Sequence, residues 1–409
     1  MTMNILVMNA GSSSQKCCLY QIDGNTFPQT PPDPLWEGKI EWSAPGGAAL
    51  TVSGAKSTLP SGPTRSDGVR QLIQTLWQGE TSVLRGPGEI TAVGHRVVHG
   101  GGDFREPTRI TDEVKAAIER LSPLAPEHNP AALEGIEAIE QLLGPDVPQI
   151  AVFDTAFHRT IAEAASVYPG PSAWIEQGIR RYGFHGINHA WCAERAAALL
   201  PGTDPATLRL VICHLGNGCS LAAVRGGKCV DTTMGFTPME GLMMGSRSGT
   251  VDPGVLLYLL GQPSGPTPTE LGRILNEESG LKGLSGVGED MRAVQAAADT
   301  GNARARLALD VYVHRLRSFI GAMIASLGGL DALIFTAGVG ENSAWVRTAA
   351  CEPFRYLDLL LDERKNSAAP DHFPERSISA PDSAIRVLVI PAHEDWAVAR
   401  ECGRLSAVC

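Results

Sequence analysis

The sequence predicts an α/β protein, and three kinds of observation lead to this fold class. Short apolar runs rich in β-branched residues, such as Asn4–Met8 and Ile90–Val98, are typical of buried strands. Segments with apolar residues at helical spacing lie between such runs. The clearest begins at Asn129-Pro130, an N-cap residue followed by proline at the first helical position. Glycine-rich turns follow several strands, and this alternation indicates sheets covered by helices.

The first part of the chain contains these elements in order. A polar turn at Asn9–Ser14 separates the first strand from a second strand at Cys17–Ile22. The segment Asp23–Pro63 is rich in Pro and Gly, so we expect short strands and loops there. Ser66 or Asp67 can cap a helix that runs to Trp77, because both residue types are favoured N-caps. The remaining elements expected here are helices at 111–121 and 129–143 and a strand at Gln149–Phe153.

The second part of the chain repeats the alternation. We expect strands at Leu208–Cys213 and Ser220–Val224 on either side of a glycine turn at His214–Gly218. A strand at Leu333–Phe335 enters a second glycine-rich turn, which leads into a helix and is suited to a nucleotide. The other expected elements are helices at 188–200, 253–260, 268–279, 288–299 and 302–326, a strand at Val387–Ile390 and a terminal helix at Glu394–Cys402.

A weak internal similarity links the two parts. The segment Leu6–Ser14 resembles Ile212–Gly218 when Gly11 is aligned with Gly216, since both consist of a strand, a polar residue and a small-residue turn. Such a turn can direct several backbone N–H groups at an anion. The pattern indicates two halves of related design, each with a phosphate-binding hairpin, and a ligand between them.

Composition excludes several classes of protein. The chain has 409 residues and a net charge of −10 without a basic run, which is unfavourable for nucleic-acid binding. The longest uncharged apolar stretch, Ser318–Leu330, is shorter than the ~20 residues that a membrane span needs. The N-terminus lacks the features of a signal peptide. Nine cysteines without a C-x-x-C pair favour reduced thiols in a cytoplasmic protein over a zinc site or a disulfide framework.

Several polar side chains lie at positions that are typical of catalytic or anion-binding groups. Arg96 lies within a β-branched strand, where it binds an anion or pairs with a carboxylate. Neighbouring His95 and His99 do not form a metal pair, because on a strand their side chains lie about 13 Å apart at ~3.3 Å per residue. Asp154 ends a strand, a common place for a catalytic group in α/β proteins. His128 precedes a helix N-terminus that favours an anion.

Three further segments could be functional. The turn Asn9–Lys16 has hydroxyl side chains and a lysine that can bind a phosphate. It lacks the residue spacing of a Walker phosphate-binding loop. The alternative is an ordinary polar hairpin turn. His185 lies between an aromatic residue and a glycine, where a structural histidine is the alternative. The long segment Asp231–Gly254 combines glycines, methionines and Arg247, and ordered loops of this length are usually functional.

Together these motifs resemble the acetate kinase family, in the family's order over nearly the whole chain. The matching segments are Asn9–Lys16, Gly94–Gly101, Pro123–Pro130, Phe153–His158, Arg181–Gly186, His214–Ser220, Asp231–Gly254, Asp290–Arg292, Phe335–Asn342 and Ile390–Arg400. The resemblance implies reversible ATP-dependent phosphorylation of acetate to acetyl phosphate and ADP. It also implies Mg²⁺, with Mn²⁺ as a substitute, and a cytoplasmic homodimer.

The implied fold consists of two actin-like (ribonuclease H-like) domains, each a mixed sheet flanked by helices, around a nucleotide cleft. The N-terminal acyl- and phosphate-binding domain would comprise residues 1–155, with a C-terminal helix at about 391–409 packed back onto it. The nucleotide-binding domain would comprise residues 156–390.

The resemblance also assigns roles to residues. Asn9 and Glu394 would belong to the magnesium environment, and Asp154 would orient substrate or metal-bound water. Arg96 and Arg247 would bind the carboxylate and the transferring phosphoryl group, which His185 would stabilise in the transition state. The phosphate side would contain Ser12, Ser14 and Lys16, with a second phosphate turn at His214, Leu215, Gly216, Asn217 and Gly218. Adenosine would be surrounded by Asp290, Met291, Arg292, Gly338, Val339, Gly340 and Asn342. The acyl pocket would be formed by Val98, Phe184 and Pro238, with His128 close by.

The chemistry agrees with these roles. A carboxylate with a pKa of ~4–5 is already a nucleophile at neutral pH, so no general base is needed and Asp154 is not assigned that role. Phosphoryl transfer needs positioning and charge neutralisation. We therefore predict direct in-line transfer, with a covalent phosphoglutamate intermediate as the alternative.

One departure from the family pattern concerns substrate choice. Glu127 stands beside His128, where an apolar residue, commonly Leu, is expected. Propionate or butyrate kinase is therefore the first alternative, since one methylene is worth only ~1–3 kcal/mol in an apolar pocket. A non-catalytic ATP-dependent switch is the second, but it has no need of Arg96, Asp154, His185 and Arg247 together. The same residues argue against an inactive homologue.

Overall fold

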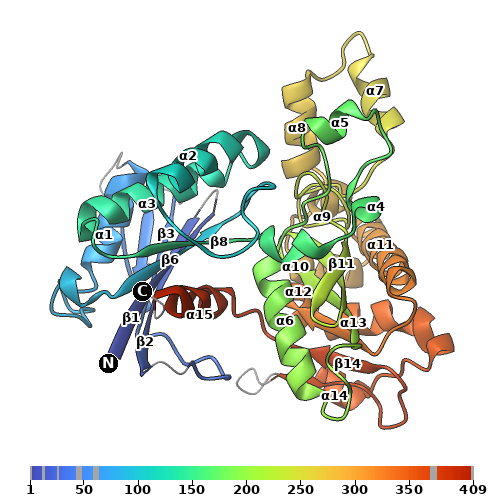
Figure 1. Ribbon diagram of the computed structural model, residues 1–409. Helices are drawn as coiled ribbons and strands as arrows, with labels where there is room; N and C mark the ends of the chain where they lie inside the picture. The colour runs from blue at the N-terminus through green and yellow to red at the C-terminus, as the bar shows by residue number, and fades with distance from the viewer. Residues whose placement is uncertain are drawn as a thin grey trace. The chain divides into compact units, whose positions relative to one another are not determined.

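The chain forms two compact units in a computed structural model that describes residues 2–11, 14–24, 27–42, 48–58, 64–368 and 375–406 (Figure 1). The first unit comprises residues 1–157 together with residues 393–409. The second unit comprises residues 158–392. The chain therefore leaves the first unit once and returns to it with its last helix.

The first unit is built on an eight-stranded mixed sheet with the order β5-β4-β3-β2-β1-β6-β8-β7. β1 pairs antiparallel with β2 and parallel with β6, which pairs parallel with β8. The strands are β1 (Thr2–Ala10), β2 (Ser14–Asp23), β3 (Trp36–Glu41), β4 (Ala49–Val52), β5 (Ala55–Thr58), β6 (Ala92–Val97), β7 (Thr108–Arg109) and β8 (Gln149–Phe153).

Helices cover both faces of this sheet, which is why the middle of β1 is apolar at every position. Leu6 and Met8 pack in one cluster with Leu72 of α1 (Arg65–Gln74) and Ile139 of α3 (Asn129–Leu143). α2 (Asp112–Leu121) packs beside α3 (Figure 1). The opposite face receives α15 (Glu394–Ser406), so closely that a Cβ at Gly94 would lie 2.8 Å from Val398.

The second unit is built on a six-stranded mixed sheet with the order β11-β10-β9-β12-β14-β13. Its strands are β9 (Arg209–Leu215), β10 (Cys219–Arg225), β11 (Lys228–Thr232), β12 (Ala332–Thr336), β13 (Arg376–Ser377) and β14 (Arg386–Val389). The helices are α4 (Glu163–Ser166), α5 (Ala173–Glu176), α6 (Gly186–Leu199), α7 (Pro253–Leu260), α8 (Pro268–Glu277), α9 (Gly280–Ser285), α10 (Met291–Asp299), α11 (Ala303–Leu327), α12 (Ala337–Asn342), α13 (Ala344–Cys351) and α14 (Glu363–Ser367).

Six strands follow the same order in both units. In the first unit the order is β3-β2-β1-β6-β8-β7, and in the second it is β11-β10-β9-β12-β14-β13. Each pair of neighbouring strands in the first order is antiparallel or parallel in the same way as the corresponding pair in the second. Gly11 and Gly216 each follow the first strand of their set, β1 and β9. The predicted α/β class with two mixed sheets flanked by helices is therefore confirmed, and the weak internal similarity reflects a shared topology.

The structure corrects four local expectations. Thr64, and neither Ser66 nor Asp67, is the N-cap of α1, which ends at Gln74. Residues 337–342 form helix α12 directly after β12, where a glycine-rich turn was expected. His214 and Leu215 end strand β9 and so precede the turn that they were expected to form. Asn129 does not cap α3, because its side chain binds the backbone of His99.

Candidate active site

The first unit gathers polar side chains at the carboxyl ends of its parallel strands. Asn9 lies near the end of β1 and pairs in register with Arg96 of β6. Asp154 directly follows β8, and Glu394 is the first residue of α15. Strands that run parallel end at the same edge of a sheet, so these four side chains come together although they are far apart in the sequence.

Arg96 is the centre of this cluster. Its Nη2 lies 2.5 Å from Oδ2 of the fully buried Asp154, and its Nη1 donates to Oδ1 of Asn9 at 3.2 Å. Its Nε lies 3.9 Å from Oε2 of Glu394. Burial alone would lower the pKa of Arg96, but the neighbouring Asp154 and Glu394 raise it above its ordinary value. Arg96 therefore stays charged, and its neighbours Asn9 and Asp154 fix the orientation of its guanidinium group.

The other expected residues of the first unit have different surroundings. Lys16 is exposed on β2 and pairs in register with Asn9, whereas Ser14 begins β2 and accepts a hydrogen bond from Gly11 N–H at 2.8 Å through its backbone. Ser12 lies outside the described residues. Val98 is buried just beyond β6.

The loop after β6 is tied to the start of α3. The side chain of Asn129 accepts from the backbone N–H of His99 at 3.1 Å and donates to its carbonyl oxygen at 3.0 Å. His128 is the N-cap residue of α3, without a side-chain capping bond, and Glu127 beside it is exposed. Asn129 thus fixes the position of His128 relative to the end of β6.

The oxygen-bearing side chains around Arg96 fit a magnesium ion that is held mainly by its substrate. Burial, the largest effect, raises the pKa of Glu394; Arg96 lowers it and Asp395 raises it further. A divalent cation would favour the ionised form of this carboxylate. Among the described residues no group of three His, Cys, Asp or Glu side chains is placed to hold a metal. Mg²⁺ commonly takes only one or two protein ligands beside water and phosphate oxygens, so Asn9 and Glu394 suit it.

The second unit places His185 at the start of α6. Its backbone is left-handed with φ 57°, and its ring stacks on that of His214 with centroids 3.9 Å apart. A Cβ at Gly218 would lie 3.2 Å from Nε2 of His185 and 3.7 Å from Nη1 of Arg247. Glycine at this position lets both side chains approach the turn closely, and a Cβ there would crowd the ring of His185.

Arg247 lies in the long segment between β11 and α7. Its Nη1 donates to the carbonyl oxygen of Pro238 at 3.3 Å. Phe184 is buried next to His185. Of the expected acyl pocket, Phe184 and Pro238 therefore belong to the second unit and Val98 to the first.

An open cavity of about 900 Å³ in the second unit has the size that a nucleotide requires. It is lined by the turn after β9, the start of α10, and α12 with the start of α13. Asp290 caps α10 and pairs with the exposed Arg292 at 2.7 Å. Of the residues expected to bind nucleotide, Gly216, Asn217, Asp290, Met291, Arg292, Gly338, Val339 and Asn342 line it, whereas His214, Leu215, Gly218 and Gly340 do not.

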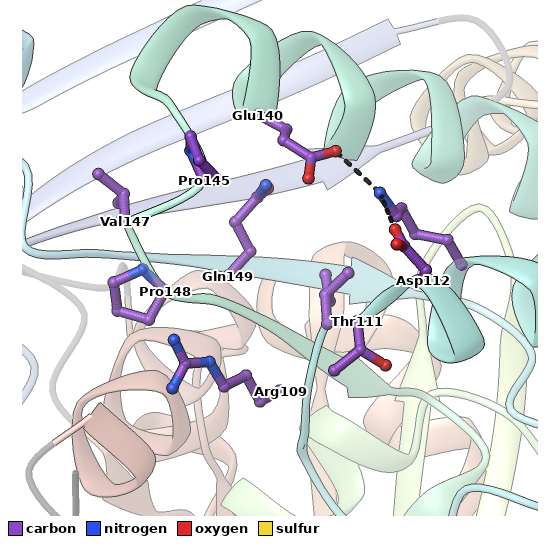
Figure 2. A pocket seen from close by; sticks show the side chains of 10 residues that line it. Arg109, Thr111, Asp112, Glu140, Pro145, Val147, Pro148 and Gln149 are labelled. Carbon is purple, nitrogen blue, oxygen red and sulfur yellow. Dashed lines mark hydrogen bonds and ion pairs between the residues drawn. The ribbon is translucent and has the colours of Figure 1, made fainter.

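Figure 2 shows a much smaller pocket, of about 80 Å³, in the first unit. Lys115 is paired there with Asp112 at 2.8 Å and Glu140 at 2.9 Å. Gln149, at the amino end of β8, contacts the buried His95 at 2.7 Å. The pocket is too small for a nucleotide and lies at the opposite end of β8 from Asp154.

Arg347, which was not among the expected site residues, supports the wall of the large cavity. This side chain is buried in α13 and donates to the carbonyl oxygens of Gly340 at 2.9 Å and Glu341 at 2.8 Å, at the end of α12. It also binds Asn366 through its side-chain and backbone oxygens. Burial lowers the pKa of Arg347 to about 10, and Arg376 contributes. No sequence pattern predicts this role, because it depends on which carbonyl groups the fold leaves near α13.

Arg347→Met is expected to lower the free energy of unfolding by about 3 kcal/mol, because buried carbonyl groups lose a charged donor. It should also weaken ATP binding, since Gly338 and Val339 of α12 line the cavity. Urea unfolding and nucleotide titration measure both effects. The control is Arg306→Met at an exposed position of α11, where Arg306 makes only a long 3.5 Å ion pair with Asp299 among the described contacts. Unchanged stability of Arg347→Met would contradict the assigned role.

A nucleotide-sized cavity beside a glycine turn, and a charged arginine held at the ends of parallel strands, are features of a phosphotransferase. The family model described as "Acetokinase family" matches residues 4–400. The chain belongs to the acetokinase family.

Individual relatives agree with this assignment. The chain is 60% identical to the acetate kinase of Gloeobacter violaceus over 404 residues, which cover 98% of each chain. It is 56% identical over 408 residues to the acetate kinase of a Cyanothece species, with 98% of each chain covered.

Solved structures show the same fold. The crystal structure of Porphyromonas gingivalis acetate kinase matches with a TM-score of 0.89 at 39% identity, covering 98% of this chain and 99% of that one. A propionate kinase from Francisella tularensis matches with a TM-score of 0.87 at 35% identity, with the same coverage.

Proposed function

We propose that this protein catalyses the reversible, Mg-ATP-dependent phosphorylation of acetate to acetyl phosphate and ADP. The observation that carries the proposal is the 60% identity to an acetate kinase over 98% of both chains. The site geometry supports it, because the chain carries both a charged, oriented arginine for a small carboxylate and a cavity for a nucleotide.

Arg96 is proposed to bind the carboxylate of acetate. Asp154 and Asn9 hold its guanidinium group by hydrogen bonds, so one orientation is selected before substrate arrives. Acetate is ionised at neutral pH and attacks the γ-phosphorus of ATP directly, in line with the departing ADP. Asp154 serves to orient Arg96 and substrate, and no proton needs to be removed.

His185 and Arg247 are proposed to stabilise the phosphoryl group during transfer. Donors aimed at the equatorial phosphoryl oxygens lower the barrier, because negative charge is spread over these oxygens in the transition state. The end of β9 and the turn after it, residues 214–218, carry the β-phosphate side of the nucleotide. The cavity around Asp290–Arg292 and Gly338–Asn342 takes adenosine. Ser12, Ser14 and Lys16 assist with phosphate in the first unit.

Asn9 and Glu394 would hold Mg²⁺, or Mn²⁺ in its place. The ion supplies positive charge that neutralises the phosphate oxygens of ATP. Glu394 is suited to it because its partly buried carboxyl group lies near Arg96 and Asp395 and gains from an additional cation.

Acetate is expected to be the best acid among acetate, propionate and butyrate. Val98, Phe184, Pro238 and His128 are proposed to enclose the methyl group, and Glu127 is exposed enough to remain hydrated outside such a pocket. The measurement is kcat/KM for each acid with Mg-ATP, with the acyl phosphate trapped by hydroxylamine. Glu127→Gln, which removes the charge and keeps the size, is expected to change each value less than twofold.

Other outcomes of this assay would change the conclusion in defined ways. A higher kcat/KM for propionate or butyrate would keep the mechanism and replace the substrate, as in the Francisella tularensis relative named a propionate kinase. No acyl phosphate from any acid, with ATP still bound, would favour a non-catalytic ATP-dependent switch.

A homodimer is proposed, with α7 in its interface. Leu257 and Tyr258 on this helix are 72% and 67% exposed, and Val255 is 48% exposed. Figure 1 shows α7 beside α8, which it contacts. In the same unit, α5 exposes Trp174 and Ile175 as well. Exposed apolar side chains that gather on neighbouring elements are typical of a protein interface.

The double variant Leu257→Asp/Tyr258→Asp is expected to shift the protein from dimer to monomer, because two charges would be buried in an apolar contact. Sedimentation velocity measures the change. Leu307→Asp is the matched control, since this leucine is also exposed, at 54%, but lies on α11. A wild-type monomer, or a dimer that survives the double substitution, would contradict the proposed interface.

The proposed site of action is the cytoplasm, where ATP is available. The eight described cysteines are buried free thiols, as is usual in a reducing compartment. No described helix is long and apolar enough to cross a membrane.

A further inference from the structure

Ser220 lies between two histidine rings in the second unit. Its Oγ is 2.9 Å from Nδ1 of His185 and 2.8 Å from Nε2 of His189. Ser220 and His189 are both fully buried. A hydroxyl group has one proton to donate, so its direction determines which nitrogen of each ring carries a proton.

The protonation of His189 is set by its other nitrogen. Nδ1 of His189 is buried and has no hydrogen-bond partner among the described residues. A buried N–H group without an acceptor is rarer than a buried acceptor without a donor, so the proton of neutral His189 belongs on Nε2. Burial, together with nearby His158 and His214, holds the pKa of His189 well below its usual range, so the ring stays neutral.

The protonation of His189 determines the direction of both hydrogen bonds that Ser220 makes with the two rings. Nε2–H of His189 donates to Ser220, whose own proton is then donated to Nδ1 of His185. We propose that Ser220 and His189 are positioning residues that keep His185 in the tautomer with its proton on Nε2. This inference rests on the proposed function, in which His185 stabilises the transferring phosphoryl group.

Nε2 is the end of His185 that the fold directs at the phosphate turn. It approaches Gly218 closely, at the position where Nη1 of Arg247 also approaches this residue. With a proton on Nε2, His185 can donate to a phosphoryl oxygen. The opposite tautomer would present a lone pair to the same oxygen and repel it.

Neighbouring groups keep the ring and its backbone in place. Nε2 of His158 lies 2.9 Å from the carbonyl oxygen of Phe184, so it donates to the residue just before His185. His214, stacked on His185, accepts at Nδ1 from the side-chain amide of Asn188 at 2.8 Å. His214 therefore also carries its proton on Nε2.

The direct test is NMR of the full-length protein labelled with ¹⁵N-histidine, without substrates. The signals of His185 are assigned by their disappearance in His185→Ala. We expect the protonated nitrogen of His185 to be Nε2 and the Nδ1 signal to be that of an unprotonated acceptor. A proton on Nδ1 of His185 in the neutral ring would overturn the proposal, whatever the variants below show.

The second test is Ser220→Ala, which removes the bridge and leaves both rings. We expect kcat to fall on the order of 10- to 100-fold, because the donor is no longer held in one form, with KM for ATP changed less than twofold. In the NMR spectrum, His185 should then populate the Nδ1–H form. Ser220→Thr, which restores the hydroxyl group, should recover most of kcat and the original tautomer.

The control is Ser379→Ala, which removes another buried hydroxyl group of the second unit, one that accepts from Val387 N–H at 2.8 Å. Its kcat should be unchanged. Ser220→Ala with wild-type kcat and an unchanged His185 tautomer would overturn the proposal. If the wild-type protein forms no acyl phosphate, the proposed function is contradicted. The NMR spectrum would still show which nitrogen of His185 carries the proton.

Discussion

Arg247→Ala is expected to lower kcat for acyl phosphate formation about 10³-fold or more. An arginine that neutralises the transferring phosphoryl group contributes on the order of 10³- to 10⁵-fold in related phosphotransfer sites. The fold should survive the substitution, because the backbone around Arg247 is held independently of its side chain. Arg247 O accepts from Met244 N–H at 3.1 Å, and Ser248 N–H donates to Leu275 O at 3.0 Å.

The measurement is turnover at saturating Mg-ATP and acetate, with urea unfolding as the check on the fold. Arg273→Ala is the matched control, since Arg273 is exposed on α8 and pairs with Glu278. It should retain wild-type kcat. Turnover of Arg247→Ala within tenfold of wild type would remove this residue from the proposed site.

Arg96→Ala is expected to affect both activity and stability. Turnover should fall at least about 10²-fold and KM for acetate should rise, because the carboxylate loses its cation. The free energy of unfolding should fall by about 3–5 kcal/mol, because the fully buried Asp154 loses the partner 2.5 Å away. Steady-state kinetics and urea unfolding measure the two effects, and Arg120→Ala, which removes an exposed pair with Asp103, is the control.

The double variant Arg96→Ala/Asp154→Asn separates the two effects. Without a negative charge on residue 154, no unpaired buried carboxylate remains, so stability should return toward wild type. Activity should stay low, because the arginine is still missing. Recovery of both quantities in the double variant would show that Arg96 acts only as a structural partner of Asp154.

The sequence allowed the elements to be predicted where local signals are strong. The Asn129-Pro130 start, the strand before Asp154 and the helix at 253–260 all correspond to observed elements. Helix α12 was taken for a turn, because its glycines lower helix propensity, whereas in the structure the carbonyl groups at its end are bound by Arg347. A contact from α13 thus overrides the local preference.

Candidate site residues could be proposed from type and position, but their partners could not. Arg96 was expected to bind an anion or pair with a carboxylate, and the structure shows Asp154 and Glu394 beside it. Ser220, His189 and Arg347 gave no signal of their own, because a buried serine, histidine or arginine acquires its role only from what the fold brings next to it. Asn129 was taken for a helix cap, and its bonds to His99 depend on a loop 30 residues away.

The return of the chain to the first unit has a consequence for the order in which the protein is made. Helix α15 covers β1 and β6 and supplies Glu394, yet residues 394–406 leave the ribosome after the whole of the second unit. One face of the first sheet therefore stays exposed while all of residues 158–392 are synthesised, although domains generally fold in the order of their synthesis. The later-encoded unit can complete its core before the earlier one. A nascent chain that stalls or is cut before residue 394 would carry an unprotected apolar sheet, which makes it a substrate for chaperones and proteases.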